Sequence, residues 1–284
     1  MPLLGTHVSV SGGLHTAFER AARAGCTTMQ LFVKNASQWK AKPLTDEEIR
    51  AFRAAAAESP VRPVIAHAAY LINLCAVAPG VMEKSRAALE DELLRCEALG
   101  VRALVFHPGS HVGAGEEAGI RCIAESLNLV HERTRGLHVL TTLETTAGQG
   151  STLGYRFEQL RAIIDQVEDR DRMAVCMDTC HMFTAGYPIH TAEGWEAAMK
   201  EFDQAVGLAR LVAVHVNDSK KPFGSRLDRH EHIGKGLIGL EGFRSLMNDP
   251  RLEQVPKILE TDKSEDMHED VENMAALKSL VRSA

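Results

Sequence analysis

Long apolar runs are missing from this 284-residue sequence. None approaches the roughly 18 consecutive apolar residues that a membrane-spanning helix needs. The N-terminal segment MPLLGTHVSV enters a strand-like pattern directly, without the basic region and cleavage site of a secretory signal. We therefore expect a cytoplasmic protein that does not act at a membrane.

The six cysteines lack the spacing of a disulfide framework. Cys176 and Cys180 form a C-x3-C pair, which is not a usual zinc or redox spacing. In a reducing compartment such residues are buried or free thiols. We leave both cysteines out of the candidate site.

Linkers and several catalytic signatures are absent as well. No Pro/Ser-rich or low-complexity segment divides the chain, so residues 1–284 are expected to form a single domain. No G-x-G-x-x-G follows the first strand-like run, which disfavours a doubly wound nucleotide-binding sheet. The sequence contains neither G-x-S-x-G nor a P-loop, so no side-chain nucleophile of that kind is evident.

Apolar, β-branched runs alternate with longer amphipathic stretches along the whole chain. Thr45 followed by Glu48 has the form of a capping box and marks a helix start. The helix candidates are 45–57, 81–99, 116–133, 157–167 and 194–206. The eight strand candidates are 3–8, 28–33, 63–66, 103–106, 138–143, 173–177, 211–214 and 257–259. Eight β/α units in about this length predict an α/β fold, a single closed (β/α)8 TIM barrel, with a doubly wound sheet as the alternative.

Six of these strands end at a side chain that can bind a metal ion. The six are His67, His107, Glu144, Asp178, His215 and Glu260. The steps between them are 40, 37, 34, 37 and 45 residues, about one β/α unit each. Strand C-termini of such a barrel meet at one face, where active sites are built. A single histidine at a strand end is more often a structural residue than a metal ligand. Here, however, a side chain able to bind metal would have to occur by chance at the end of each of the six strands.

Three further candidates lie just beyond strand ends. His181 follows Asp178 by three residues, and the polar loop after His215 brings Asp228 and His230. Nine ligands without a thiolate are too many for one zinc ion. They predict a cluster of two or three metals, with bridging carboxylates and open positions for water.

The other histidines do not follow this pattern. Three of them lie near the proposed face: His7, His111 and His232. We expect these side chains either to contact the metal ligands or the substrate, or to have no role in the site. The remaining ones are expected to be packing or surface residues: His15, His131, His138, His190 and His268.

The net charge of −6 is only a weak argument against a polyanionic partner. Three bound divalent cations would add +6, so the net charge of the metal-loaded protein would be −6 + 6, or about zero. Local charge is more informative, because the loop that carries Asp228 and His230 is crowded with basic side chains. These are Lys220, Lys221, Arg226, Arg229 and Lys235.

Four long motifs resemble the endonuclease IV family of apurinic/apyrimidinic (AP) endonucleases. They are FHPGSH (106–111), LETTAGQGSTLG (143–154), CMDTCH (176–181) and HVNDSK…GSRLDRHEHIGKG (215–236). The resemblance covers essentially the whole chain, from GTHVSVSGGL to ILET. It implies a DNA-repair nuclease on a TIM barrel with three zinc ions per chain, of which one position also suits Mn²⁺.

The resemblance divides the nine ligands into three sets. The first set is His67, His107 and Glu144. The second set shares Glu144 as a bridge and adds Asp178, His215 and Glu260. The third set is His181, Asp228 and His230. Glu144 and Glu260 would in addition act in catalysis by orienting the attacking water.

The resemblance also marks residues for DNA binding. Tyr70 and Leu71, in AHAAYLINL, match the family's DNA-penetrating pair. Such side chains on a loop can fill the gap left when a nucleotide leaves the stack; from the residues alone, both would pack the loop against the barrel. Ser37 stands where family members often carry an arginine that also inserts into the DNA. This predicts a weaker wedge, meaning the side chains that enter the gap in the duplex, or another side chain that supplies the function of the arginine. The basic candidates are Lys220, Arg226 and Arg229.

The implied reaction is hydrolysis of the phosphodiester 5′ to an abasic site in double-stranded DNA. It leaves a 3′-hydroxyl and a 5′-deoxyribose phosphate, uses a metal-activated water, and is accompanied by cleaning of blocked 3′ ends. We expect the enzyme to act as a monomer.

The residues alone are also compatible with two other functions. A metal-dependent sugar isomerase or epimerase on a similar barrel would bind one or two metals and would not need the third ligand set or the basic loop. A non-enzymatic protein that binds damaged DNA would leave abasic duplex uncut and would not need open metal positions.

Overall fold

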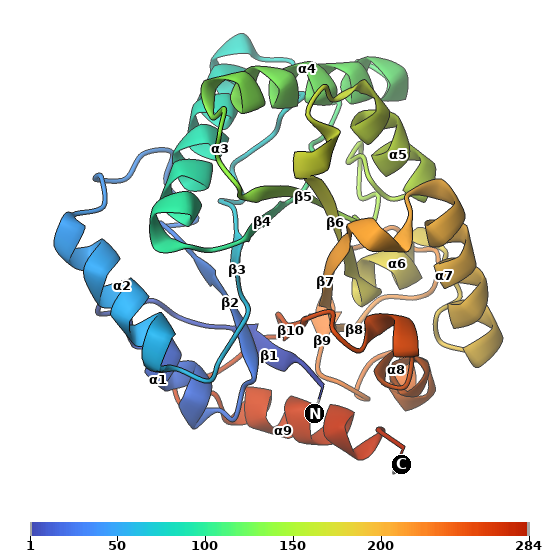
Figure 1. Cartoon of the computed structure of the whole chain (residues 1–284). Helices are drawn as coiled ribbons and strands as arrows, with labels where there is room; N and C mark the ends of the chain where they lie inside the picture. The colour runs from blue at the N-terminus through green and yellow to red at the C-terminus, as the bar shows by residue number, and fades with distance from the viewer. Residues whose placement is uncertain (1, 283–284) are drawn as a thin grey trace.

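The computed structural model describes residues 2–282, which form a closed barrel of parallel strands surrounded by helices (Figure 1). The strand order around the barrel is β1-β10-β7-β6-β5-β4-β3-β2. The barrel strands are β1 (Leu4–His7), β2 (Thr28–Phe32), β3 (Val64–His67), β4 (Ala103–Phe106), β5 (Leu140–Glu144), β6 (Met173–Asp178), β7 (Leu211–His215) and β10 (Lys257–Leu259). β8 (Asp218–Ser219) and β9 (His230–Glu231) form a separate antiparallel pair in the loop after β7.

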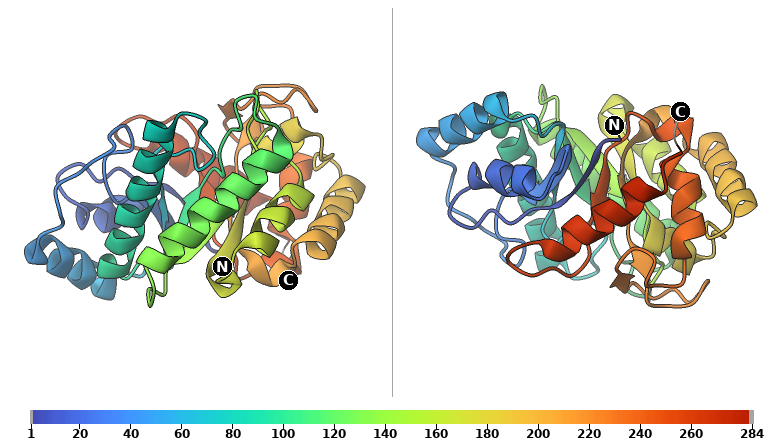
Figure 2. Two further views of the ribbon diagram at one scale, coloured as in Figure 1. Left: turned by 90° about the horizontal axis from the view of Figure 1, so that it is seen from above. Right: turned by 90° about the horizontal axis from the view of Figure 1, so that it is seen from below.

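The helices form the outer layer, and the last of them lies beside the first strand (Figure 2). They are α1 (Thr16–Arg23), α2 (Asp46–Glu58), α3 (Pro79–Leu99), α4 (Glu116–Arg133), α5 (Phe157–Gln166), α6 (Thr179–Ala185), α7 (Ala192–Ala205), α8 (Gly239–Met247) and α9 (His268–Ser279). Three short 3-10 turns are Arg170–Arg172, Leu208–Arg210 and Pro250–Leu252. Within residues 2–282, no helix has the length and apolar character to cross a membrane.

The strand pleat divides the buried apolar side chains into two cores. In β4, Val105 belongs to the small core inside the barrel, whereas its neighbours Leu104 and Phe106 pack outward against the helices. The inner core consists of Ile65, Ala103, Val105, Cys176, Ala213 and Ile258. The helices meet the outer core with apolar residues at steps of three and four, as α4 does with Ile120, Ile123, Leu127 and Val130.

The predicted barrel is confirmed, and its closed strand order excludes the doubly wound sheet. All eight predicted strands are present, and the five predicted helices begin and end within two residues of the expected positions. The Thr45 side chain accepts a hydrogen bond from the Glu48 N–H and completes the predicted capping box. The elements that the periodicity missed are α1, α6, α8, α9 and the β8–β9 pair. Of these, α6 is buried on nearly every side, so it has no apolar stripe to recognise.

Gly5 provides a test of how closely β1 and β2 are packed. A Cβ at this position would lie 1.8 Å from the carbonyl oxygen of Thr28, which belongs to the backbone and cannot move aside by rotation. Gly5→Ala should therefore lower the free energy of unfolding by about 3 kcal/mol or more. The measurement is urea denaturation followed by circular dichroism.

The matched control is Gly80→Ala in α3, where a Cβ meets nothing within 4 Å. In a helix this change should raise the free energy of unfolding by up to about 1 kcal/mol. An unchanged urea midpoint for Gly5→Ala would contradict the close approach of the two strands.

Candidate metal centre

The ligand candidates point into the mouth of the barrel because side chains two residues apart share one face of a strand. In β4 and β7 the interior residues are Val105 and Ala213, and His107 and His215 follow them by two positions. The same step relates four other pairs: Ile65 and His67, Thr142 and Glu144, Cys176 and Asp178, and Ile258 and Glu260. Each of these six strands therefore continues its inward row of side chains with a group that could bind a metal ion.

In the first set, two imidazoles face one oxygen of Glu144. The Nε2 atoms of His67 and His107 lie 3.1 and 3.3 Å from Glu144 Oε2. Nδ1 of His67 lies 2.8 Å from the carbonyl oxygen of Ala68, which accepts its proton. In the neutral form of His67, Nε2 therefore carries the lone pair and points it toward the site.

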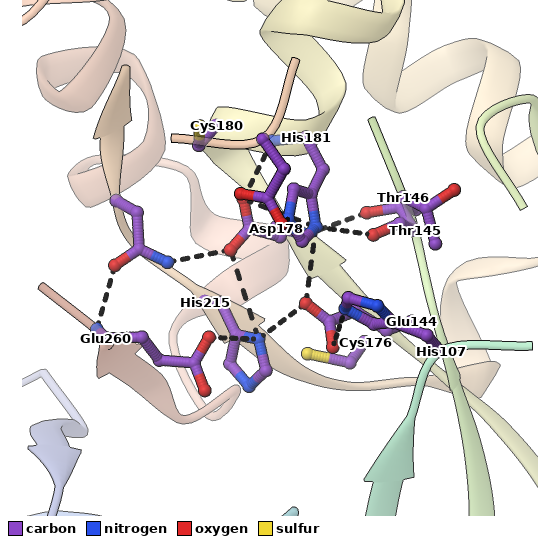
Figure 3. Close-up of polar contacts among 12 residues, drawn as sticks. His107, Glu144, Thr145, Thr146, Cys176, Asp178, Cys180, His181, His215 and Glu260 are labelled. Atoms are coloured by element: carbon purple, nitrogen blue, oxygen red, sulfur yellow. Dashed lines mark hydrogen bonds and ion pairs between the residues drawn. The ribbon is translucent and has the colours of Figure 1, made fainter. Parts of the chain in front are cut away.

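The second set gathers around the other oxygen of the same carboxylate. His215 Nδ1 lies 2.9 Å from Glu144 Oε1 and 3.1 Å from Glu260 Oε2 (Figure 3). Asp178 Oδ2 is 4.0 Å from the same nitrogen. Because the two oxygens of Glu144 face different ligand sets, this carboxylate has the geometry of a bridge between two metal ions.

The third set is held together by Asp228. Its Oδ2 lies 3.0 Å from His181 Nε2, and its Oδ1 lies 3.3 Å from His230 Nε2. The Nδ1 atoms of the two rings face carbonyl oxygens of Thr145 and Glu260, at 2.8 and 3.2 Å. Both Nε2 atoms are buried, and neither forms a well-aligned hydrogen bond with any residue between 2 and 282. Buried nitrogens that lack such a partner fit a metal ion in its place.

The hairpin of β8 and β9 lies in the loop that supplies Asp228 and His230 of this third set. Ser219 pairs with His230 across the hairpin. The buried Asp218 carboxylate accepts hydrogen bonds from the backbone N–H groups of Gly234, Gly236 and Ile238. The hairpin pairing therefore places His230 beside Ser219, and the Asp218 carboxylate holds the segment that follows it.

The electrostatics of the centre favour ionised carboxylates. Burial alone would raise the pKa of Glu144, but the charge of His215 and the hydrogen-bonding imidazoles of His107 and His181 outweigh it and hold this pKa well below its usual range. The pKa of Glu260 is likewise lowered against the effect of its burial, chiefly by His215. Such a concentration of carboxylates and imidazoles is the nitrogen and oxygen donor set that zinc accepts.

Burial disfavours the thiolate form of the two cysteines near the centre. Cys180 Sγ lies near Asp228 and His230, but burial raises the pKa of its thiol to about 12. Burial also raises the pKa of Cys176 to about 11. All six cysteines are unpaired in the structure, as expected from their spacing.

The candidate DNA contacts fall into two groups. Tyr70, Lys220 and Arg229 line an open cavity of about 320 Å³ together with ligands of all three sets. Leu71, the next residue after Tyr70, is half-buried, and Arg226 lies with its guanidinium 4.6 Å from the centre of the Tyr155 ring. Ser37 is exposed on the loop after β2.

Tyr70 is not part of the core, although its position after β3 allowed that interpretation. Its side chain is 69% exposed, and its closest ring neighbours are Phe32 and His67, with ring centres at 5.4 and 5.8 Å. An exposed aromatic ring at the edge of a polar cavity is available to a ligand.

Sequence reasoning missed residues that orient the ligands. The Asn217 amide donates to Asp178 Oδ2 at 2.7 Å, and its oxygen accepts from the Glu260 N–H at 2.8 Å. The Thr145 hydroxyl accepts from the Asp178 N–H at 2.8 Å. Asn217 follows His215 by two positions, so the strand periodicity that marks the ligands also marks this amide.

Comparison with known proteins first defines a class. The family model of the xylose isomerase-like TIM barrel matches residues 18–280. A D-tagatose 3-epimerase-like protein shares the fold, with a TM-score of 0.74 at 18% identity over 99% of this chain and 97% of that one. The chain is therefore a xylose isomerase-like barrel with a cluster of metal-binding side chains at the C-terminal ends of its strands.

Closer similarity defines the family within that class. "Probable endonuclease 4" of Chloroflexus aurantiacus is 48% identical over 284 residues, which are 100% of both chains. The crystal structure of endonuclease IV from Thermus thermophilus has a TM-score of 0.86 at 36% identity and covers 98% of both chains. This chain belongs to the endonuclease IV family of AP endonucleases, as its motifs predicted.

Metal analysis of an Asp228→Asn variant tests the third ligand set. Because Asp228 faces both His181 and His230, loss of its charge should remove about one metal ion per chain. The measurement is elemental analysis after dialysis against trace zinc. The control is Asp266→Asn in the exposed Asp266, His268 and Glu269 cluster, which should retain the full metal content. Equal content in Asp228→Asn and the parent would contradict the third set.

Proposed function

We propose that this chain is an AP endonuclease that hydrolyses the phosphodiester 5′ to an abasic site in double-stranded DNA. Residues 1–284 would act as one catalytic domain and as a cytoplasmic monomer, with three zinc ions per chain and Mn²⁺ acceptable at one position. The observation that carries the proposal is Glu144, whose two oxygens face two ligand sets that include residues lining an open cavity.

The nine side chains would hold the ions in three sets. The first set is His67, His107 and Glu144. The second is Glu144, Asp178, His215 and Glu260. The third is His181, Asp228 and His230. When bound, the ions supply Lewis acidity and lower the pKa of water from 15.7 to about 7, so that hydrolysis needs no side-chain nucleophile.

The protein's own residues would orient the water and bind the substrate. Glu260 lines the cavity and would accept a hydrogen bond from the attacking water, and Glu144 would act with it from behind the histidines that line the cavity. Lys220 and Arg229 line the same cavity and would bind DNA phosphates. Arg226 and Leu71 would extend the contact along the duplex.

Selectivity for damage would come from Tyr70. Extruding an abasic nucleotide costs less than extruding an intact one, because no base has to be unpaired. The exposed Tyr70 ring can then stack in the gap that opens in the duplex. With Ser37 in place of an arginine, this ring would provide most of the wedge.

A sugar isomerase or epimerase is the second candidate, since such enzymes share the fold. It would leave the third ligand set and the basic side chains of the cavity without a role. A DNA-binding protein without activity is the third candidate. It would leave the open cavity over the metal ligands unexplained.

The test is incubation of the purified protein with a duplex that contains one abasic site, with and without a chelator. We expect a single cut that leaves a 3′-hydroxyl and a 5′-deoxyribose phosphate and that stops when the metal is removed. A second substrate with a blocked 3′ end tests the cleaning activity. Binding without incision in the presence of zinc would favour the DNA-binding protein, and near one zinc per chain would favour the isomerase.

Glu144→Ala should abolish incision, because it removes the carboxylate that faces both the first and second ligand sets. We expect the rate to fall by roughly three orders of magnitude or more. Circular dichroism should show an intact barrel, because Glu144 is the last residue of its strand. Near-normal incision would refute the bridging role.

Tyr70→Ala should weaken binding to abasic duplex by roughly tenfold, since a stacked base is worth about 1–3 kcal/mol. Its metal content should match that of the parent. The control is Val77→Ala, which truncates an exposed apolar side chain further along the same connection, away from the cavity lining. Equal binding of abasic duplex by Tyr70→Ala and the parent would end the wedge role.

A further inference from the structure

Gln30 lies on β2, a strand that ends without any of the nine ligand candidates. Its side chain is fully buried and reaches the second ligand set. The amide nitrogen lies 2.6 Å from Glu260 Oε1, and the amide oxygen lies 2.8 Å from His215 Nε2. The same amide nitrogen is 3.0 Å from Nδ1 of His7, at the end of β1.

The chemistry of these neighbours fixes which way the amide points. An ionised carboxylate only accepts hydrogen bonds, so the atom 2.6 Å from Glu260 Oε1 must be the NH₂ group. The amide oxygen then faces His215, and this oxygen can only accept. His215 must therefore carry a proton on Nε2, because a bare nitrogen there would place two acceptors in contact.

With a proton on Nε2, Nδ1 is the nitrogen of neutral His215 that can bind a metal ion. Nδ1 is the nitrogen that faces Glu144 and Glu260, at 2.9 and 3.1 Å. The second proton of the Gln30 NH₂ group points to Nδ1 of His7, so His7 completes the chain as an acceptor.

We propose that Gln30 is a positioning residue that sets the tautomer of His215 and the orientation of Glu260 for the metal ion of the second set. This inference rests on the proposed metal centre. It deepens that proposal by assigning a function to a neutral side chain that lies outside the nine ligands. Partners of this kind typically raise metal affinity by 10–100-fold.

Gln30→Met tests the role, because methionine nearly fills the space of glutamine but cannot form these hydrogen bonds. The zinc affinity at the second set, measured by competition with a chromophoric chelator, should fall by 10–100-fold. The matched control is Thr28→Val on the same strand, which loses one partly buried hydrogen bond to the carbonyl oxygen of Pro63 and none to the ligands. Its zinc affinity should stay within about threefold of the parent.

A measurement on the unmutated protein keeps the inference testable if Gln30→Met does not fold. In zinc-loaded protein labelled with ¹⁵N-histidine, the rings that ligate through Nδ1 and keep a proton on Nε2 should include His215. A proton on Nδ1 of His215, or unchanged zinc affinity in a folded Gln30→Met, would overturn the inference.

The outcomes separate this inference from the proposed function. If the parent protein binds no metal or leaves abasic duplex intact, the proposed function fails before Gln30 is tested. If the parent binds zinc and incises but Gln30→Met has the same zinc affinity, only the positioning role fails.

Discussion

The buried carboxylate of Glu144 is the group on which the rest of the site depends. It is fully buried, it ends β5, and its two oxygens face imidazoles that come from opposite sides of the barrel. A carboxylate in this position would be costly without positive charge around it. The arrangement therefore suits the binding of cations. The neighbouring histidines compensate the negative charge of Glu144 only in part.

The ligand candidates of the centre come from barrel strands and from loops. The strands place the first and second sets by continuing an inward row of side chains, so their positions follow from the pleat. In the third set, His181 lies on α6, whereas Asp228 and His230 come from the loop that contains the β8–β9 hairpin. A change in this loop would therefore act directly on the third set.

Much of this was predictable from the sequence, and the reason is periodicity. The ligands at strand ends recur once per β/α unit, so the barrel and six of the nine candidates could be recognised together. Asn217 follows the same two-residue step after His215, but Gln30 could not be found in that way, because its strand ends without a ligand candidate and a neutral amide is no sign of a metal site. The hairpin strands of two residues each, and the wholly buried α6, have no hydrophobic pattern of their own. Family resemblance, rather than spacing, supplied the grouping of the ligands.

The most direct test of the bridged centre is a crystal structure of the zinc-loaded protein with anomalous scattering at the zinc edge. We expect two strong peaks on opposite sides of the Glu144 carboxylate, one beside each oxygen, and a third beside His181, Asp228 and His230. A single peak that contacts both Glu144 oxygens, or no peak at this carboxylate, would contradict the bridge.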